Sequence, residues 1–443
     1  MGSTAVSAMV ALAMLIPAAS AQPGGQDEAV ARFEAAATTE GATRARLGVL
    51  GDAFTCADAR FVSFRRSDAE PQIVDQWYVA SQVWADAALL RVAAPEMPMG
   101  DSSKLTGWDS LDTRCYVDKG FVFLDRLWDY TRSGYFPMSD PVGANVATRL
   151  RFGDDNTVAG LALLETASST TDPLLLQRYI HAAEREADFL TDPVTGLWDT
   201  RFGGGFWWET ARGDTDEGKP AQTNALAALF FVRLYNATGI STYRDWALRT
   251  LLWLDTILYD PGRHLYRWSV GYQDLTNRTG AIIHQRYFNY DQGIAVEAQI
   301  EAAQLDGDQN RLSRSRDVGR AIQTAFWSND RGGYNLESGI DQVYASYAAW
   351  TSLGHLAMYR LDGSSEWLAL ARQNLNSLQT DLAEPDGGYA FRSYRCLDRV
   401  AKGCETGQVQ HVVDHTRDTS AQAWMQHLQA SVAGAELPEV SPR

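Results

Sequence analysis

The chain has 443 residues, 45% of them hydrophobic, which is enough apolar material for a large buried core. Asp and Glu outnumber Lys and Arg, 55 to 39, and the formal net charge is −16. Because no Lys/Arg cluster occurs in the sequence, this charge argues against nucleic acid or an anionic membrane as a partner.

The first 21 residues carry no charge and form an apolar run that ends in Ala19-Ser20-Ala21. This pattern is typical of a signal peptide, so we predict that residues 1–21 are cleaved off and that the protein is secreted or periplasmic. An uncleaved anchor is the alternative, although the run is short for a membrane span. No later stretch reaches a spanning length, so we expect no membrane span in the mature form.

The remaining chain exceeds the usual size limit of one hydrophobic core, yet no linker rich in Pro, Ser or charge divides it. We therefore predict one large domain over residues 27–435, shaped as a ring or a solenoid. We expect it to be a monomer.

From Asp27 onward, apolar residues recur at three- and four-residue spacing between clusters of Gly, Pro and Asp, and this pattern predicts helices. Twelve helices are predicted, at residues 28–49, 71–93, 118–132, 154–169, 173–191, 219–238, 241–259, 288–305, 308–327, 341–361, 364–381 and 418–431. Residues 158–164 and 225–232 are apolar nearly all round, as expected for inner helices, whereas residues 173–191 are amphipathic, as expected for an outer helix.

Aromatic residues end the joints that connect these helices. They are Tyr135, Trp198, Tyr266, Tyr334 and Tyr389, which follow one another after 63, 68, 68 and 55 residues. A period of this size corresponds to one helical hairpin with its loop. Six such hairpins can close into a ring, so we predict an all-α fold, an (α/α)6 barrel or six-hairpin toroid. An open solenoid of the same hairpins, with a concave face that binds protein, is the alternative.

Four cysteines, an even number, fit an exported chain with two disulfides. The sequence cannot fix their connectivity, but Cys396 and Cys404 lie in one Gly-containing segment, which leaves Cys56 to pair with Cys115. A zinc site is the alternative, and it is a poor one because no pair has C-x-x-C spacing.

Asp154 and Asp155 stand at the head of the apolar run that begins at Val158. Asp is a good helix N-cap and is favoured in a first turn, so capping is one explanation, but a single Asp would suffice for it. Paired carboxyl groups with different pKa values, one protonated and one ionised, are what glycoside hydrolysis requires. The pair is therefore the candidate catalytic site.

Three further motifs accompany the pair: Gly203–Trp208, Gln222–Ala227 and Tyr290–Gly293. Together the motifs resemble glycoside hydrolase family 76, over roughly residues 70–431. That family comprises endo-acting α-1,6-mannanases with an (α/α)6 barrel. The resemblance implies a secreted, retaining endo-glycosidase that hydrolyses α-linked glycans, with α-1,6-mannan as the expected substrate. It also implies Asp154 as the nucleophile and Asp155 as the acid/base.

The chain departs from the family pattern at three positions. Gly153 precedes the pair where the family has an aromatic residue, with Phe152 one residue further back, and Val158 stands where the family has Trp. The family's Tyr-Asn-Gln-Gly has Asp291 in place of Asn. These changes leave the barrel intact and bear on the sugar specificity.

Six residues are expected to bind the substrate beside the pair: Trp207, Trp208, Asn224, Tyr290, Asp291 and Gln292. Sugar faces stack on aromatic rings, and adjacent Trp207 and Trp208 cannot easily both face one core; core packing is the alternative for any single aromatic. For Asn224 and Gln292, which begin apolar helices, the alternative is capping or a satisfied buried amide. Asp291 is expected to tune the pKa values of the pair by repulsion or to hold a substrate hydroxyl.

No cofactor and no metal are expected. His411 and His415, with Asp414 between them, have metal-like spacing, but they lie in an irregular stretch without the H-E-x-x-H arrangement, so we predict a surface position. No P-loop, dinucleotide fingerprint or G-x-S-x-G occurs. Two alternatives to the glycosidase stay open: a non-catalytic glycan-binding or interaction protein on the same barrel, and an unsaturated uronyl hydrolase.

Overall fold

The computed structural model describes residues 25–93, 108–137, 150–194, 196–213, 215, 217–396 and 410–437. Within them the chain forms twelve α-helices. They are α1 (Gly25–Leu47), α2 (Gln76–Val92), α3 (Ser110–Arg126), α5 (Gly153–Ser168), α6 (Pro173–Thr191), α7 (Ala221–Thr238), α8 (Ser241–Trp253), α9 (Asn289–Asp306), α10 (Gln309–Phe326), α11 (Ala345–Asp362), α12 (Ser365–Leu382) and α13 (Thr419–Glu436).

Short strands lie in the connections between the helices. They are β1 (Gly48–Leu50), β2 (Val62–Phe64), β3 (Lys219–Pro220), β4 (Tyr259–Asp260), β5 (Leu265–Tyr266), β6 (Ser269–Gly271), β7 (Ile282–His284), β8 (Trp327–Ser328), β9 (Gly333–Tyr334), β10 (Gln342–Tyr344), β11 (Arg392–Cys396) and β12 (Gln410–Asp414). All of their pairings are antiparallel, and the two largest sheets have the strand orders β3-β6-β7 and β10-β11-β12.

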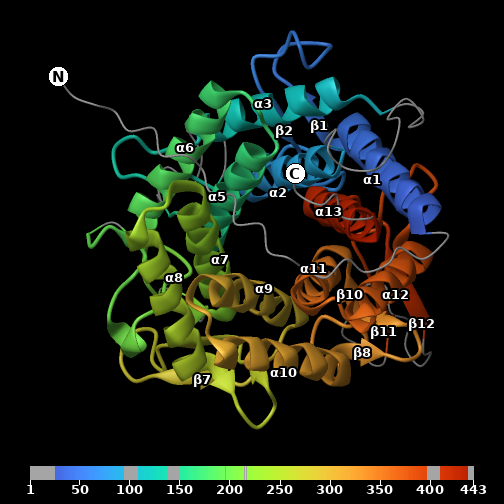
Figure 1. Ribbon diagram of the computed structural model, residues 1–443. Helices are drawn as coiled ribbons and strands as arrows, with labels where there is room; N and C mark the ends of the chain where they lie inside the picture. Colours follow the sequence, from blue (N-terminus) through green and yellow to red (C-terminus); the bar gives the residue numbers. More distant parts are fainter. Residues whose placement is uncertain are drawn as a thin grey trace.

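Six helices form a closed inner ring in the order α2, α5, α7, α9, α11 and α13, and α13 packs against α2 (Figure 1). Five outer helices each cover the inner helix that precedes them: α3, α6, α8, α10 and α12. The sixth pair joins the two ends of the described chain, because α1 packs on α13. The all-α (α/α)6 barrel is thereby confirmed, and the alternative of an open solenoid is not observed.

Burial separates the two rings as the sequence predicts. Helix α7 buries every residue from Ala225 to Val232 and α5 every residue from Val158 to Leu164. Helix α6 buries one face only, with Tyr179, Ala183 and Phe189 among its buried residues. A helix that is apolar all round belongs in a core, whereas an amphipathic helix belongs at its surface, so the inner and outer assignments are confirmed.

Two helices show what fixes the boundaries. Helix α6 spans residues 173–191, as predicted, because Asp172 accepts the N–H of Leu174 and Pro occupies the first helical position. The helix expected at 118–132 is shifted: it begins at Ser110 behind the capping side chain of Asp109, and it ends before the next joint starts. In these two helices the capping side chain therefore fixes the first residue more strongly than the apolar spacing does.

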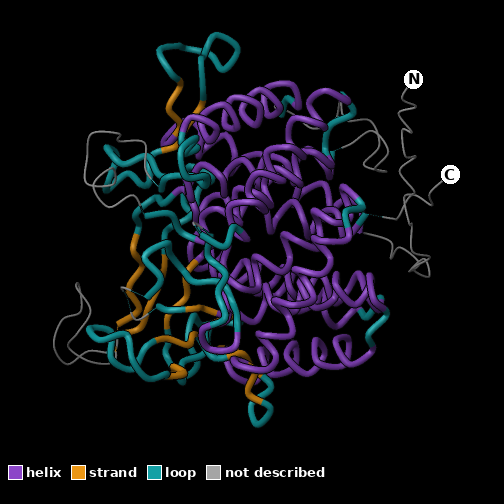
Figure 2. The backbone as a smooth tube through the Cα atoms, turned by 90° about the vertical axis from the view of Figure 1, so that its left-hand side faces the viewer, coloured by secondary structure: helices purple, strands orange, loops and turns teal. Residues whose placement is uncertain are grey.

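The strands and longer connections gather at one end of the helices, as Figure 2 shows. Each inner helix from α5 onward follows directly from these connections, so the inner helices begin at this end and run parallel to one another. The N-terminal turns of six helices therefore meet around one axis. This convergence is what allows residues from distant parts of the sequence to form one site.

Amide side chains hold four of the aromatic joints to the inner helices. Each amide is the fourth residue of its helix; the four are Asn156, Asn224, Gln292 and Gln422. Each amide oxygen accepts the backbone N–H of an aromatic residue at 2.6 or 2.7 Å, and each amide nitrogen donates to the carbonyl oxygen of that same residue. In chain order these residues are Tyr135, Phe206, Tyr266 and Tyr389, and Phe206 pairs with the joint aromatic Trp198. The amide thus pairs with a peptide group as a neighbouring strand would.

One of the two predicted disulfides is confirmed. Cys56 and Cys115 are bonded, and the bridge fastens the β1–β2 connection to α3. The second predicted bridge, between Cys396 and Cys404, depends on Cys404, which lies outside the described residues.

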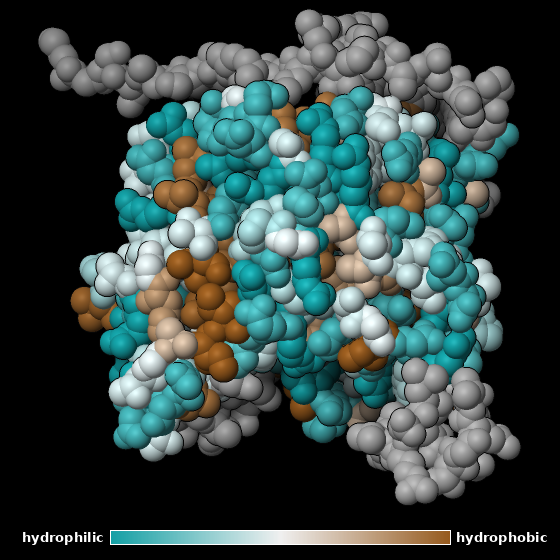
Figure 3. All heavy atoms as spheres, turned by 90° about the horizontal axis from the view of Figure 1, so that it is seen from below, coloured by the Kyte–Doolittle hydropathy of each residue, from teal (hydrophilic) through white to brown (hydrophobic). Residues whose placement is uncertain are grey.

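The outer surface fits the two-ring arrangement. Seen from below, it is largely hydrophilic, with apolar residues gathered in a few places (Figure 3). In the described part of the chain, none of the helices combines the length and the hydrophobicity that crossing a membrane would need.

Candidate active site

A cavity of about 520 Å³ opens at the end of the barrel where the inner helices begin. Half of its lining comes from the second and third residues of these helices: Trp77, Asp154, Asp155, Gln222, Tyr290 and Tyr347. Connecting segments and helix caps supply Trp208, Glu217, Pro220, Trp268, Arg286 and Phe288. The Asp pair therefore lies in the wall of this cavity, among aromatic rings.

The pair does not cap its helix. The N-cap of α5 is Phe152, whose side chain makes no capping hydrogen bond, and α5 begins one residue before Asp154. Both carboxyl groups stay in the first turn, where the helix dipole favours negative charge. The capping explanation is therefore not what the structure shows, and both side chains are available to the cavity.

The two carboxyl groups have different hydrogen-bond partners. Asp154 accepts two hydrogen bonds: the indole Nε1 of Trp208 donates to Oδ2 at 3.1 Å, and the backbone N–H of Asp155 donates to Oδ1 at 3.0 Å. Among the described residues, no donor bonds to the carboxyl group of Asp155. Hydrogen bonds from N–H groups stabilise the ionised form of a carboxyl group, so Asp154 is the better stabilised anion.

The pKa values of the pair move apart for this reason. Burial raises the pKa of Asp154 to about 6, and the hydrogen bonds from Trp208 and the Asp155 amide hold it from rising further. Burial raises the pKa of Asp155 well above its usual range, and the charges of Asp154 and Asp75 raise it more. Asp154 is therefore the stronger acid of the two, and Asp155 holds its proton more tightly.

Trp208 and Trp207 have separate surroundings. Trp208 lines the cavity and packs on Phe152, with ring centroids 4.8 Å apart. Trp207 is fully buried behind it, where its indole donates to Asp199 and its ring stacks on Tyr272. Trp208 thus lines the cavity, whereas Trp207 supports the wall from behind.

A buried lysine fixes the loop that carries these tryptophans. The Lys219 Nζ donates to Oδ1 of Asp199 and to the carbonyl oxygens of Arg201 and Gly204, all within 2.8 Å. Gly205 adopts φ +86°, and a Cβ there would lie 2.5 Å from the ring of Trp253. The loop therefore needs glycine for its path, and the buried ammonium group holds that path rigid.

The Tyr290–Gly293 motif divides between the cavity and the core. Tyr290 lines the cavity, stacked on Phe288 at 5.4 Å. Asp291 is fully buried outside the cavity lining, and burial raises its pKa well above the usual range, which favours the uncharged acid. Asn224 and Gln292 are also fully buried, with both amide functions bonded to the aromatic joints. The structure thus brings Tyr290 to the pair and places the other three behind the wall.

Several lining residues were not expected from the sequence. Trp77 and Tyr347 occupy the second and third positions of α2 and α11, the same places in their helices as the Asp pair has in α5. These equivalent positions could have identified both lining residues from the sequence, but only if the first residue of each helix had been predicted correctly. Arg286 lies over the ring of Trp268 and forms an ion pair with Glu337 at 2.9 Å.

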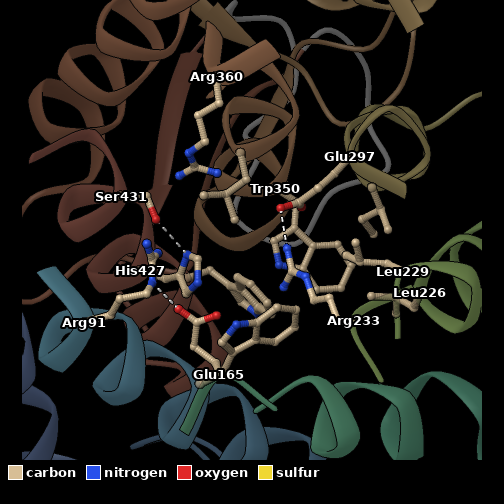
Figure 4. Close-up of a pocket in the computed structure, with 14 residues that line it drawn as sticks. Arg91, Glu165, Leu226, Leu229, Arg233, Glu297, Trp350, Arg360, His427 and Ser431 are labelled. Atoms are coloured by element: carbon tan, nitrogen blue, oxygen red, sulfur yellow. Dashed lines mark hydrogen bonds and ion pairs between the residues drawn. The ribbon is translucent and has the colours of Figure 1, made fainter. Parts of the chain in front are cut away.

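A second cavity lies further along the axis, towards the C-terminal ends of the inner helices (Figure 4). Four of its five charged residues are paired within the ring, Arg91 with Glu165 and Arg233 with Glu297, and Arg360 is the fifth. Cations are favoured at helix C-termini, and Arg91 and Arg360 lie in the last turns of α2 and α11. Arg233 lies further inside α7, where its ion pairs account for it. Trp350 lies between the two cavities, in contact with Trp77, and the cluster is remote from the Asp pair.

The candidate metal ligands do not converge. His411 and His415 are exposed, and His415 bonds to Glu384 at 2.6 Å. Within the described residues, no group of three His, Cys, Asp or Glu side chains is arranged to hold a metal ion.

Comparisons with known proteins agree with this geometry. Residues 137–342 match the family model of glycosyl hydrolase family 76. A family 76 glycoside hydrolase from a bovine Bacteroides thetaiotaomicron strain superposes with a TM-score of 0.68 at 17% identity, over 91% of this chain and 77% of that one. An α-1,6-mannanase of the family from Salegentibacter sp. HEL1_6 gives 0.62 at 18% identity, over 91% and 99%. No curated protein sequence matches the chain.

A further solved structure of the same fold contains a bound sugar. An inactive variant of the Salegentibacter sp. HEL1_6 enzyme, with two consecutive aspartates replaced by asparagine, is a complex with α-1,6-mannotriose. It matches at a TM-score of 0.62 and 16% identity, over 91% of this chain and 99% of that chain. At such identities the structures show a shared fold, and the family match shows that residues 137–342 are similar to glycoside hydrolase family 76.

Proposed function

We propose that this relative of glycoside hydrolase family 76 is a retaining endo-glycosidase that cleaves α-linked glycans, with α-1,6-mannan as its first candidate substrate. Asp154 is the nucleophile and Asp155 the acid/base. The observation that carries the proposal is the unequal hydrogen bonding of the two carboxyl groups. Asp154 accepts two hydrogen bonds, and Asp155 accepts none among the described residues. The pair thus supplies one ionised and one protonated carboxyl group, as the reaction requires.

The first step forms a glycosyl–enzyme bond. A carboxylate oxygen of Asp154 attacks the anomeric carbon while Asp155 donates its proton to the leaving glycosidic oxygen. Successive residues in a helix point about 100° apart, so both carboxyl groups can face one sugar at the roughly 5 Å separation typical of retaining enzymes. The second step reverses the roles: Asp155 takes a proton from water, and the hydroxyl oxygen displaces Asp154.

The aromatic lining supports a sugar substrate. Trp77, Trp208, Trp268 and Tyr290 lie around the pair and present apolar faces to the cavity. Such rings match the C–H faces of a sugar, with polar groups at their edges. The inactive mannanase variant described above lacks two consecutive aspartates and binds α-1,6-mannotriose, which supports mannan as the first substrate to try. The signal peptide would place this activity outside the cytoplasm.

The lining also weighs against an unsaturated uronyl hydrolase. A uronate carboxylate calls for a free cation, usually an arginine. Among the cavity-lining residues that the structure describes, Arg286 is the cation, and Glu337 already pairs with it. The neutral sugar is therefore the better fit.

The experiment is proton NMR of the first-formed anomer from a reducing-end-labelled α-1,6-mannan oligosaccharide. We expect the α-anomer first, with Asp154→Ala inactive and rescued by azide to give a β-glycosyl azide. Asp291→Asn is the matched control because it changes a nearby carboxyl group that lies outside the cavity lining. An initial β-anomer would refute the nucleophile role. If the protein binds the glycan without cleaving it, the alternative of a non-catalytic glycan-binding protein would be favoured.

A further inference from the structure

We propose that Arg66 and Asp75 are positioning residues that set the protonation of Asp155 by opposing charges. The inference rests on the proposed function, because it concerns the acid/base. Both residues lie outside the segment that matches the family model, and neither lines the cavity. They belong to the stretch that closes the ring between its last and first inner helices.

The backbone around Arg66 is fixed on both sides. Its N–H donates to the carbonyl oxygen of Ile73 at 2.7 Å, and its own carbonyl oxygen accepts the N–H of Thr419, the first residue of α13, at 2.9 Å. Asp68 donates to the carbonyl oxygen of Arg417 at 3.0 Å. This stretch therefore lies across the heads of α13 and α2, and the guanidinium group of Arg66 projects from a rigid position.

Asp75 connects that guanidinium group to the helix beside the pair. Its Oδ1 accepts the N–H of Trp77 and caps α2, while its Oδ2 lies 3.4 Å from Arg66. The next residue, Gln76, donates from Nε2 to the carbonyl oxygen of Asp155 at 2.7 Å. Asp75 is therefore held one residue from a direct contact with the backbone of the acid/base.

The charges that face Asp155 come from three elements. On α5, the carboxylate of Asp154 raises its pKa; at the head of α2, Asp75 raises it as well. Arg66 lowers the pKa of Asp155. Among the described residues, it is the cation that acts on this carboxyl group. The head of α13 adds Asp418, which acts on Asp75 rather than on Asp155 directly.

The rest of the cavity adds uncharged and distant groups. Tyr290 and Tyr347 line the wall, and burial raises the pKa of both phenols, so they are neutral in the working range. Glu217 and Arg286 lie in the lining from connecting segments. Neither of the latter two is among the groups that shift the pKa of Asp155.

This arrangement answers a chemical demand of the second step. Asp155 must hold its proton in the first step and accept one from water in the next, so its pKa must exceed the working pH without becoming extreme. Burial and two neighbouring carboxyl groups push the pKa upwards, and Arg66 opposes them. Its side chain is 35% exposed, so the effect is partly screened and smaller than that of a direct partner.

The test uses opposite changes of charge in the full-length protein. Arg66→Gln removes the cation, and we expect the pKa of Asp155 to rise by about half a unit to one unit. Asp75→Asn removes the neighbouring anion and keeps a capping side chain, so the pKa should fall by a similar amount. The alkaline limb of the kcat/KM profile should move in the same directions. Arg66→Lys keeps the positive charge, so it should shift the pKa of Asp155 by less than half as much as Arg66→Gln does.

Two readouts keep this inference separate from the proposed function. Carbon NMR of protein labelled at the Asp carboxyl carbons, with the Asp155 signal assigned by Asp155→Asn, gives the pKa without any substrate. The matched control is Arg65→Ala, which removes the same charge one residue away. The inference would be overturned if the pKa of Asp155 shifted equally in the control. It would also be overturned if that pKa did not shift, or shifted in the same direction in both test variants. Opposite shifts without hydrolysis would refute only the proposed function.

Discussion

Replacing Trp208 by phenylalanine should change the pH dependence of the reaction more than its maximum. The substitution removes the Nε1 donor that bonds to Oδ2 of Asp154 at 3.1 Å and keeps an aromatic ring against Phe152. Asp154 would retain its other hydrogen bond, from the backbone N–H of Asp155. The nucleophile therefore stays in place but loses the strongest influence that opposes its protonation.

The size of the effect follows from the hydrogen bond. A hydrogen bond to a charged group contributes about 1.5–3 kcal/mol, and one pKa unit corresponds to about 1.4 kcal/mol. Water can enter this open cavity and replace part of the loss, so we expect a rise of about one unit. The pKa of Asp154, about 6 in the intact protein, would approach 7. The ionised fraction at pH 6 would fall about fivefold, whereas at pH 8 it would change little.

The assay is kcat/KM between pH 4.5 and 9 on an α-1,6-mannan oligosaccharide, because this parameter reports the pKa values of the free enzyme. Trp268→Phe is the control: it removes an indole from the same cavity without touching Asp154, so its acid limb should stay in place. An unchanged acid limb in a folded Trp208→Phe protein would refute the reasoning. So would an equal loss of activity at every pH, which would indicate a binding role alone.

Three further predictions concern stability and are measured by thermal or denaturant unfolding. Replacing Cys56 and Cys115 together by serine should lower the unfolding free energy by about 4 kcal/mol for a loop of this length. Asn224→Ala should lower it by about 1–3 kcal/mol, because the buried N–H of Phe206 loses its acceptor, while the KM of the folded fraction stays unchanged. Asp155→Asn should raise the melting temperature relative to the original protein, and this gain should be larger at pH 8 than at pH 4. The folded state raises the pKa of this carboxyl group, so its contribution to stability is present below about pH 4 and is lost as the pH rises.

Much of the fold was predictable because the two rings have different sequence patterns. Helices that are buried on all sides, such as α5 and α7, read as unbroken apolar runs, and outer helices such as α6 read as amphipathic. Boundaries were less predictable where a cap lies inside a plausible helix. The start expected near residue 71 moves to Gln76, because Asp75 accepts the N–H of Trp77 and fixes the first turn there. Apolar spacing alone does not contain that information.

The site was predictable only in part, for a physical reason. Asp154 and Asp155 stood out because charge at the head of an apolar helix is costly. Asn224 and Gln292 stand at the heads of equally apolar helices, yet their amides pair with backbone groups of distant joints. An amide satisfied by a peptide and an amide that binds a hydroxyl look alike in sequence. The partner that distinguishes them comes from a loop 18 or 26 residues away.

The two carboxyl groups acquire different roles because neighbours from different hairpins surround them. Trp208, from the connection before α7, stabilises the ionised form of Asp154, whereas Asp75, at the head of α2, favours the protonated form of Asp155. Changes on the α7 side should therefore move the acid limb of the pH profile, and changes on the α2 side the alkaline limb. The double variant Trp208→Phe with Arg66→Gln tests this separation. If each limb has its own source, both shifts should appear together and nearly add, because the altered groups share no partner. Strongly non-additive shifts would show instead that the pair titrates as one coupled unit.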